Sequence, residues 1–204
     1  MKNAKNWAWL LLFGSLWGMS EVIGGEVLYN NNIPHASVWL TAWALFILGL
    51  GRGIINKAGT STVIGCVAAV FKLVNASPYF CHILGIFFLG LAFDLASTLL
   101  MKNERKISYR SLLTGVLSVY SGYALFALTI TYIVRFEPWV GGGINKVLDH
   151  IFIVGSLAAL ASLVLVPLGY KTGITGEVMI KRRSSWPWAV TGVVLLWVLV
   201  RIIG

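Results

Sequence analysis

Long apolar runs recur along this chain, and they constrain its fold more than any other feature. They are roughly 14 to 24 residues long, close to the roughly 20 that a helix needs to cross a hydrocarbon core about 30 Å thick. The 204 residues are 58% hydrophobic and 11% charged, whereas soluble domains carry about 25% charged residues. The sequence therefore predicts an all-α integral membrane protein, a bundle of six to seven transmembrane helices.

Hydropathy predicts that these helices form a single transmembrane domain over residues 1–204. The expected helices are 7–29, 36–54, 61–74, 81–101, 111–134, 147–167 and 186–203. The first six form a core over about 7–168 and the last is an additional C-terminal helix. All five prolines fall at or near expected helix ends, where a missing N–H costs least. Pro167 is thus expected to end the sixth helix.

The basic residues between the apolar runs predict the orientation. Of the 16 Lys and Arg residues, 12 fall in the connections of one side and three in those of the other. Because basic residues accumulate on the cytoplasmic side, the N-terminus is expected there and, with seven spans, the C-terminus outside. The net charge of +9 indicates contact with anionic lipid and not with nucleic acid. We expect a multi-pass protein of a prokaryotic cytoplasmic (inner) membrane.

Four ionisable residues fall within the expected spans, namely Glu21, Glu26, Lys72 and Asp94. Each costs at least about 2.5 kcal/mol to insert, so each is a candidate functional residue. Glu21 and Lys72 belong to the outer half on faces rich in small residues, where they would either pair to lock helix packing or face a ligand. Glu26 lies at the mouth of a pocket or in solvent. Asp94 could be protonated, pair with a neighbour or contact a partner.

Further polar residues cluster at the outer ends of the helices: His35, Cys81 with His82, and Asp149 with His150. These types can bind a transition metal, but without a close-spaced ligand motif they fit a polar outer rim equally well. The sequence has no GxSxG, Walker A or HExxH motif. The glycines at 141–143 predict a flexible loop.

Two segments, 14–21 (GSLWGMSE) and 64–73 (IGCVAAVFKL), resemble the substrate-binding (S) components of energy-coupling-factor vitamin transporters. The resemblance implies a pocket, open to the outside, that captures a vitamin or related nutrient as a small-molecule substrate. It also implies an energising module, a transmembrane coupling protein with ATPases, that docks at Gly14 and Gly18. The family has six spans with both ends cytoplasmic, so a seventh span departs from it.

The pocket expected from the resemblance and from the outer polar residues would be lined by seven side chains. These ligand-binding candidates are Glu21, Glu26, Lys72, Cys81, His82, Asp149 and His150. A cobalamin-specific branch of the family has a cysteine that ligates cobalt. Cys81 resembles it, although such a cysteine also serves as a small apolar filler. No cofactor of its own is expected, and cobalamin or another vitamin would be bound as substrate.

Three classes of function follow from these residues. The first is a binding and transport subunit that is not an enzyme and carries no nucleotide motif of its own. The second is a membrane-embedded enzyme that uses Cys81, His82 or His150 with Glu21 as acid or base. The third is a structural or assembly subunit whose buried charges only fix packing.

Overall fold

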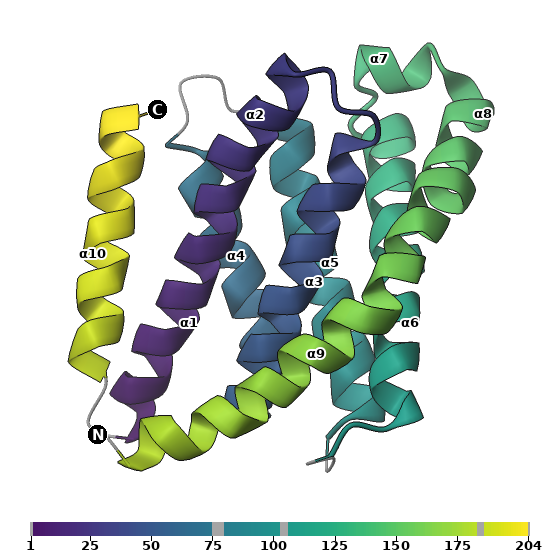
Figure 1. The fold of residues 1–204 in the computed structure, drawn as a ribbon. Helices are drawn as coiled ribbons and strands as arrows, with labels where there is room; N and C mark the ends of the chain where they lie inside the picture. Colours follow the sequence, from purple (N-terminus) through teal and green to yellow (C-terminus); the bar gives the residue numbers. More distant parts are fainter. Residues whose placement is uncertain (1, 75–79, 103–105, 183–185, 204) are drawn as a thin grey trace.

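A computed structural model describes residues 2–74, 80–102, 106–182 and 186–203, with the backbone alone at 2–4, 178–182 and 203. Within these ranges all regular secondary structure is helical (Figure 1). Five helices are long and apolar enough to cross a membrane: Lys5–Asn30, Ala36–Ile54, Phe80–Leu100, Tyr109–Ile133 and Gly143–Glu177. Thr60–Lys72 and Trp186–Ile202 are shorter apolar helices. The predicted all-helical, membrane-compatible fold is confirmed.

Three of the long helices contain a π-helical turn that subdivides them. The first of these long helices consists of α1 (Lys2–Met19), η1 (Ser20–Gly24) and α2 (Gly25–Asn30). The undivided helices α3 (Ala36–Ile54), α4 (Thr60–Lys72) and α5 (Phe80–Leu100) come next in the chain. The second subdivided helix consists of α6 (Tyr109–Leu128) and η2 (Thr129–Ile133), and the short α7 (Glu137–Val140) follows it. The third subdivided helix consists of α8 (Gly143–Leu148), η3 (Asp149–Val154) and α9 (Gly155–Arg182), and α10 (Trp186–Ile203) follows it.

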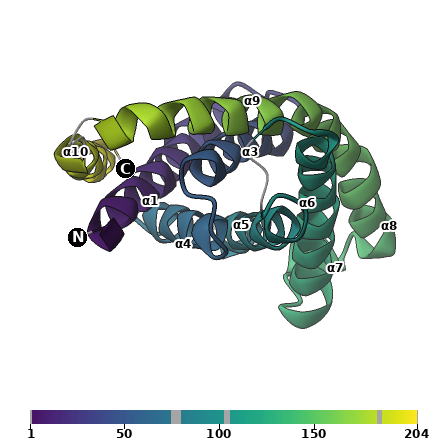
Figure 2. The same cartoon turned by 90° about the horizontal axis from the view of Figure 1, so that it is seen from below.

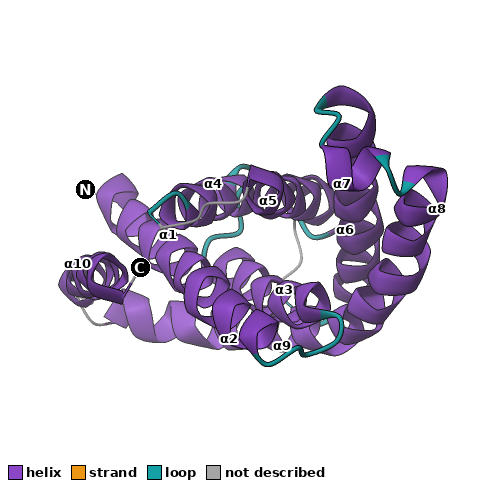
Figure 3. Ribbon diagram, turned by 90° about the horizontal axis from the view of Figure 1, so that it is seen from above, coloured by secondary structure: helices purple, strands orange, loops and turns teal. Residues whose placement is uncertain are grey.

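The helices surround an elongated interior. Figures 2 and 3 show α4 and α5 in one row and α3 with α9 in the facing row, with α6 closing one side and α1 the other. α10 packs outside this ring against α1. We call the end with α2, α7 and α8 the upper end and the end with the N-terminus the lower end (Figure 1).

The closest helix contact is the crossing of α3 and α9. A Cβ added at Gly49 would lie 2.8 Å from the Val166 carbonyl oxygen. One at Gly169 or Gly173 would collide with main-chain atoms of α3, at Phe46 and Leu50 respectively. The two backbones therefore touch through glycines, as small residues permit in membrane bundles.

One expectation about the last third of the chain was wrong. Pro167 does not end its helix but lies inside α9, which continues to Arg182. The residues after Pro167 remain helical because they form the crossing with α3, where Tyr170 is completely buried. The loop expected at 141–143 is a short turn at 141–142 that joins α7 to α8. Gly143 begins α8 and adopts the positive φ of 58° that favours glycine.

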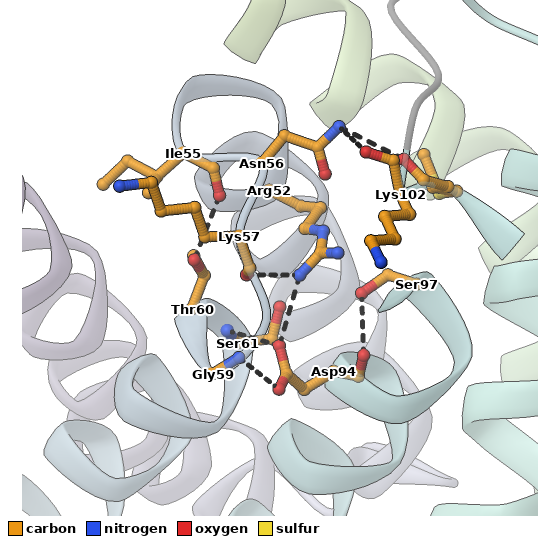
Figure 4. A network of polar contacts seen from close by, with 11 residues as sticks. Arg52, Ile55, Asn56, Lys57, Gly59, Thr60, Ser61, Asp94, Ser97 and Lys102 are labelled. Atoms are coloured by element: carbon orange, nitrogen blue, oxygen red, sulfur yellow. Dashed lines mark hydrogen bonds and ion pairs between the residues drawn. The ribbon is translucent and has the colours of Figure 1, made fainter. Parts of the chain in front are cut away.

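A buried polar network joins α3, α4 and α5 near the lower end (Figure 4). The Asp94 carboxylate accepts hydrogen bonds from the backbone N–H of Gly59 at 2.7 Å and of Ser61 at 3.2 Å. It also pairs with the Arg52 guanidinium at 3.4 Å, which donates to the Lys57 carbonyl oxygen as well. Of the three roles considered for Asp94, the structure gives the pairing with a neighbour. The carboxylate also satisfies donors at the start of α4, where a negative charge is favourable.

Candidate functional site

A cavity of about 410 Å³ lies at the upper end of the bundle, between η1, the first turns of α3 and α5, the second half of α6, and η3. Its inner wall includes Trp17, which is 1% exposed, whereas Tyr29 at its outer part is 81% exposed. The volume lies within the roughly 300 to 1,000 Å³ of typical small-molecule sites. This cavity is the candidate binding site.

Two of the π-helical turns carry side chains that line the cavity. Glu21 lies in η1 and His150 lies in η3. A π turn accommodates one more residue than an α turn, which changes the direction in which the following side chains project, and such turns are frequent at functional sites. The irregular segments of the two helices thus coincide with the cavity wall.

Glu21 is buried, with 8% of its surface exposed. Its Oε1 accepts a hydrogen bond of 3.0 Å from the indole N–H of Trp17, one turn earlier. The ammonium group of Lys72 donates at 2.8 Å to the main-chain carbonyl oxygen of Glu21 and not to its carboxylate. Within the described residues no ion pair of 4 Å or less joins Glu21 to Lys72. Of the two arrangements considered for these residues, they do meet, but the ammonium contacts the main-chain carbonyl oxygen of Glu21 and not its carboxylate.

Aromatic rings form the wall on the α6 side. The imidazole of His150 stacks on Tyr123 with ring centroids 4.6 Å apart and planes at 17°. It also contacts the edges or faces of Phe126 at 5.4 Å and Trp139 at 5.1 Å. The Tyr123 hydroxyl shares a 2.9 Å hydrogen bond with the hydroxyl of Thr41 across the cavity. The rings on this side of the cavity therefore pack against one another.

Four of the seven predicted ligand-binding residues line this cavity: Glu21, Cys81, His82 and His150. Cys81 is partly buried and His82 is exposed, both in the first turn of α5. The other three lie apart from the lining. Lys72 is buried behind Glu21, and Glu26 and Asp149 are exposed.

The structure also shows the surroundings of the residues predicted to bind a metal or to dock a partner. In the part of the chain that the structure describes, no three His, Cys, Asp or Glu residues are grouped so as to hold a metal ion. Gly14 and Gly18 are covered by Val67 and Phe71 of α4, so in this structure their face is an internal helix contact.

Sequence reasoning missed other aromatic and hydroxyl residues of the wall, above all Tyr123, Phe126 and Thr41, whereas Trp139 was expected either to anchor at the membrane surface or to line a pocket. Such residues are ordinary in apolar helices, so composition alone does not distinguish them. Trp17 had a usable signal, because its spacing of four residues from Glu21 puts both on one helical face.

The site therefore combines an apolar, aromatic enclosure with a few polar groups, the usual composition of a site that binds a small molecule. Comparisons with protein-family models, with curated proteins and with solved structures gave no match for this chain.

Proposed function

We propose that this chain is the membrane-embedded, substrate-binding subunit of an uptake system for a vitamin or related small nutrient. The observation that carries the proposal is the cavity at the upper end, with aromatic rings on its wall and the buried Glu21 in its lining. Placing a carboxylate inside an apolar bundle is costly. A ligand that binds to the Glu21 carboxylate would explain why this costly group is found there.

In this proposal the chain crosses the membrane seven times, with α4 and α10 as the two short spans. Basic residues, among them Lys57 and Lys106, lie in the connections at the lower end, and basic connections favour the cytoplasmic side. The cavity at the upper end then opens to the outside, where a nutrient arrives.

The subunit carries out no reaction of its own and depends on a partner for energy. The sequence contains no Walker A loop, and its resemblance to S components supports a partner module with a transmembrane coupling protein and ATPases. Because Gly14 and Gly18 are covered by α4, the partner would use a surface other than the one expected from these glycines.

The size of the cavity favours a vitamin smaller than cobalamin. At about 410 Å³ it is in the lower part of the range for drug-sized ligands, and a corrinoid with its nucleotide loop is much larger than such a ligand. Cys81 then lines the site as a small, partly buried side chain and not as a cobalt ligand.

Filling the cavity tests the proposal. Gly85 lines the cavity, and a Cβ there would meet its nearest neighbour, the Phe126 ring, only at 3.8 Å. Gly85→Leu should therefore occupy ligand space without a backbone collision. The matched control is Gly176→Leu in α9, where a Cβ would have no neighbouring atom within 4 Å.

We would purify wild type and both variants in a neutral detergent. Native mass spectrometry would detect co-purified molecules, and thermal shifts would report binding of biotin, riboflavin, thiamine, pyridoxine and cobalamin. We expect a ligand with wild type and Gly176→Leu, and at least about tenfold weaker binding with Gly85→Leu, whose side chain removes contact volume. A wild-type protein that stays empty and unshifted throughout the panel would contradict the proposal.

A further inference from the structure

The charges around the cavity are unbalanced. Among the described lining residues Glu21 is the one acidic side chain, and neither lysine nor arginine is present. The other ionisable groups of the lining are the imidazoles of His82 and His150, the Cys81 thiol and the tyrosine hydroxyls. This contrasts with the whole chain, whose net charge is +9. In this basic protein the described lining of the cavity thus contains one acidic side chain and no lysine or arginine.

The Glu21 carboxylate keeps hydrogen-bonding capacity toward the cavity. A carboxylate can accept about four hydrogen bonds, and the described contacts provide the one from Trp17. The nearest cation, Lys72, is oriented by the main-chain carbonyl of Glu21, although it is near enough to attract the carboxylate electrostatically. The carboxylate thus accepts one side-chain hydrogen bond and has a lysine nearby that does not contact it, and a positively charged group in the cavity would stabilise it further.

The aromatic rings around Glu21 suit the same type of partner. Trp17, Tyr123 and Phe126 line the cavity with it, and the faces of such rings attract cations within about 6 Å of their centroids. Trp139 already shows this behaviour, because the ammonium of the exposed Lys146 lies 5.2 Å from its ring centroid. Lys146 is not a lining residue, and among the described contacts no lysine or arginine lies over Trp17, Tyr123 or Phe126. One face of Tyr123 is covered by His150.

From these contacts we infer that the cavity takes an organic cation, a small molecule whose positively charged nitrogen sits against the Glu21 carboxylate among the inner aromatic rings. This inference rests on the proposed function and names the class of its substrate. Tyr29 lies eight residues from Glu21, about 12 Å along the helix at 1.5 Å per residue. The apolar part of the ligand would extend over this distance toward the upper end.

The test uses three probes of similar size that differ in charge: benzyltrimethylammonium, benzyl alcohol and benzoate. Their binding to the full chain in a maltoside detergent would be measured by thermal shift and tryptophan fluorescence. The variant Glu21→Gln removes the charge while keeping the shape and the acceptor for Trp17. Glu137→Gln, an exposed acid of α7 outside the lining, is the matched control.

We expect benzyltrimethylammonium to bind at least about tenfold more tightly than the other two probes, because it alone brings the opposite charge. Glu21→Gln should lose at least about tenfold of this affinity, and Glu137→Gln should retain it. The inference is overturned if benzyl alcohol or benzoate binds as tightly, if Glu21→Gln binds the cation like wild type, or if no probe binds.

These failures can be told apart from failure of the proposed function. If benzyl alcohol or benzoate binds and Gly85→Leu abolishes that binding, the cavity is a ligand site and the cation inference alone is wrong. If Gly85→Leu leaves the binding of every probe and vitamin unchanged, the cavity is not the binding site and both proposals fall.

Discussion

Two acidic residues inside this bundle, Asp94 and Glu21, differ in how their charge is satisfied. Asp94 receives two backbone N–H groups and the guanidinium of Arg52. Glu21 receives the Trp17 indole and faces a cavity. A carboxylate whose acceptor sites are filled by the fold stabilises structure, whereas one left with free acceptor sites next to an open volume is placed for a ligand.

Asp94→Asn should destabilise the protein strongly. The amide leaves the Arg52 guanidinium buried without its counter-charge and weakens the hydrogen bonds from Gly59 and Ser61. Removing one partner of a buried pair costs about 3 to 5 kcal/mol. Thermal unfolding in detergent should show a markedly lower melting temperature. The same exchange at the exposed Asp149 should leave it unchanged, and equal melting of the two variants would contradict the structural role of Asp94.

At the scale of the helices, the crossing of α3 and α9 fixes the bundle most tightly. Its contact is made by backbone atoms at Gly49, Gly53, Gly169 and Gly173. On each helix two of these glycines are four residues apart, the small-xxx-small spacing of close helix pairs. No side chain separates the two helices at this point, so even one added methyl group must push them apart.

Gly169→Ala and Gly173→Ala should therefore each lower the free energy of unfolding by about 1 to 3 kcal/mol or more, as in overpacked interiors. Gly176→Ala in the same helix meets open space and should stabilise by up to about 1 kcal/mol through better helix propensity. Thermal unfolding of the three variants checks this. If Gly169→Ala and Gly176→Ala melted alike, the backbone contact would be refuted.

The helices themselves could largely be predicted from the sequence. The expected 36–54 and 186–203 coincide with Ala36–Ile54 and Trp186–Ile203, because apolar runs bounded by polar turns are read directly from hydropathy. The continuation of α9 through Pro167 could not be predicted, since it depends on contacts with α3. The π turns were also missed, because one extra residue in a helix leaves hydropathy unchanged.

The candidate site was predictable only in its ionisable members. Glu21 and Lys72 were expected to be near each other, because both lie in the outer half on small-residue faces. Which oxygen of Glu21 the ammonium contacts is a matter of side-chain conformation that sequence spacing does not determine. Thr41 and Tyr123 are 82 residues apart in the chain, so the contact between their hydroxyls forms only when the helices have assembled into the bundle.

For the whole molecule, the two ends differ in chemistry. The upper end holds the cavity and the short helices α7 and α8, whereas the connections of the lower end hold many of the basic residues. This asymmetry is the basis of the proposed orientation.

Labelling of single cysteines tests that orientation. In a background with Cys66 and Cys81 replaced by serine, Lys57→Cys marks the lower end and Gly142→Cys the upper end. Both positions are exposed. Because basic connections favour the cytoplasm, a membrane-impermeant maleimide should label position 142 in intact cells and position 57 only after permeabilisation. The reverse pattern would place the cavity on the cytoplasmic side.

The shortness of α4 has a consequence for the surrounding lipid. Thr60–Lys72 has 13 residues, about 20 Å of helix at 1.5 Å per residue, against a hydrocarbon core about 30 Å thick. Val70 and Leu73 are more than half exposed along this side. In the proposed arrangement with α4 as a membrane span, such hydrophobic mismatch requires the adjacent leaflets to thin or polar groups near the helix ends to reach inward. A membrane of shorter acyl chains therefore fits this edge of the protein better than a thick one.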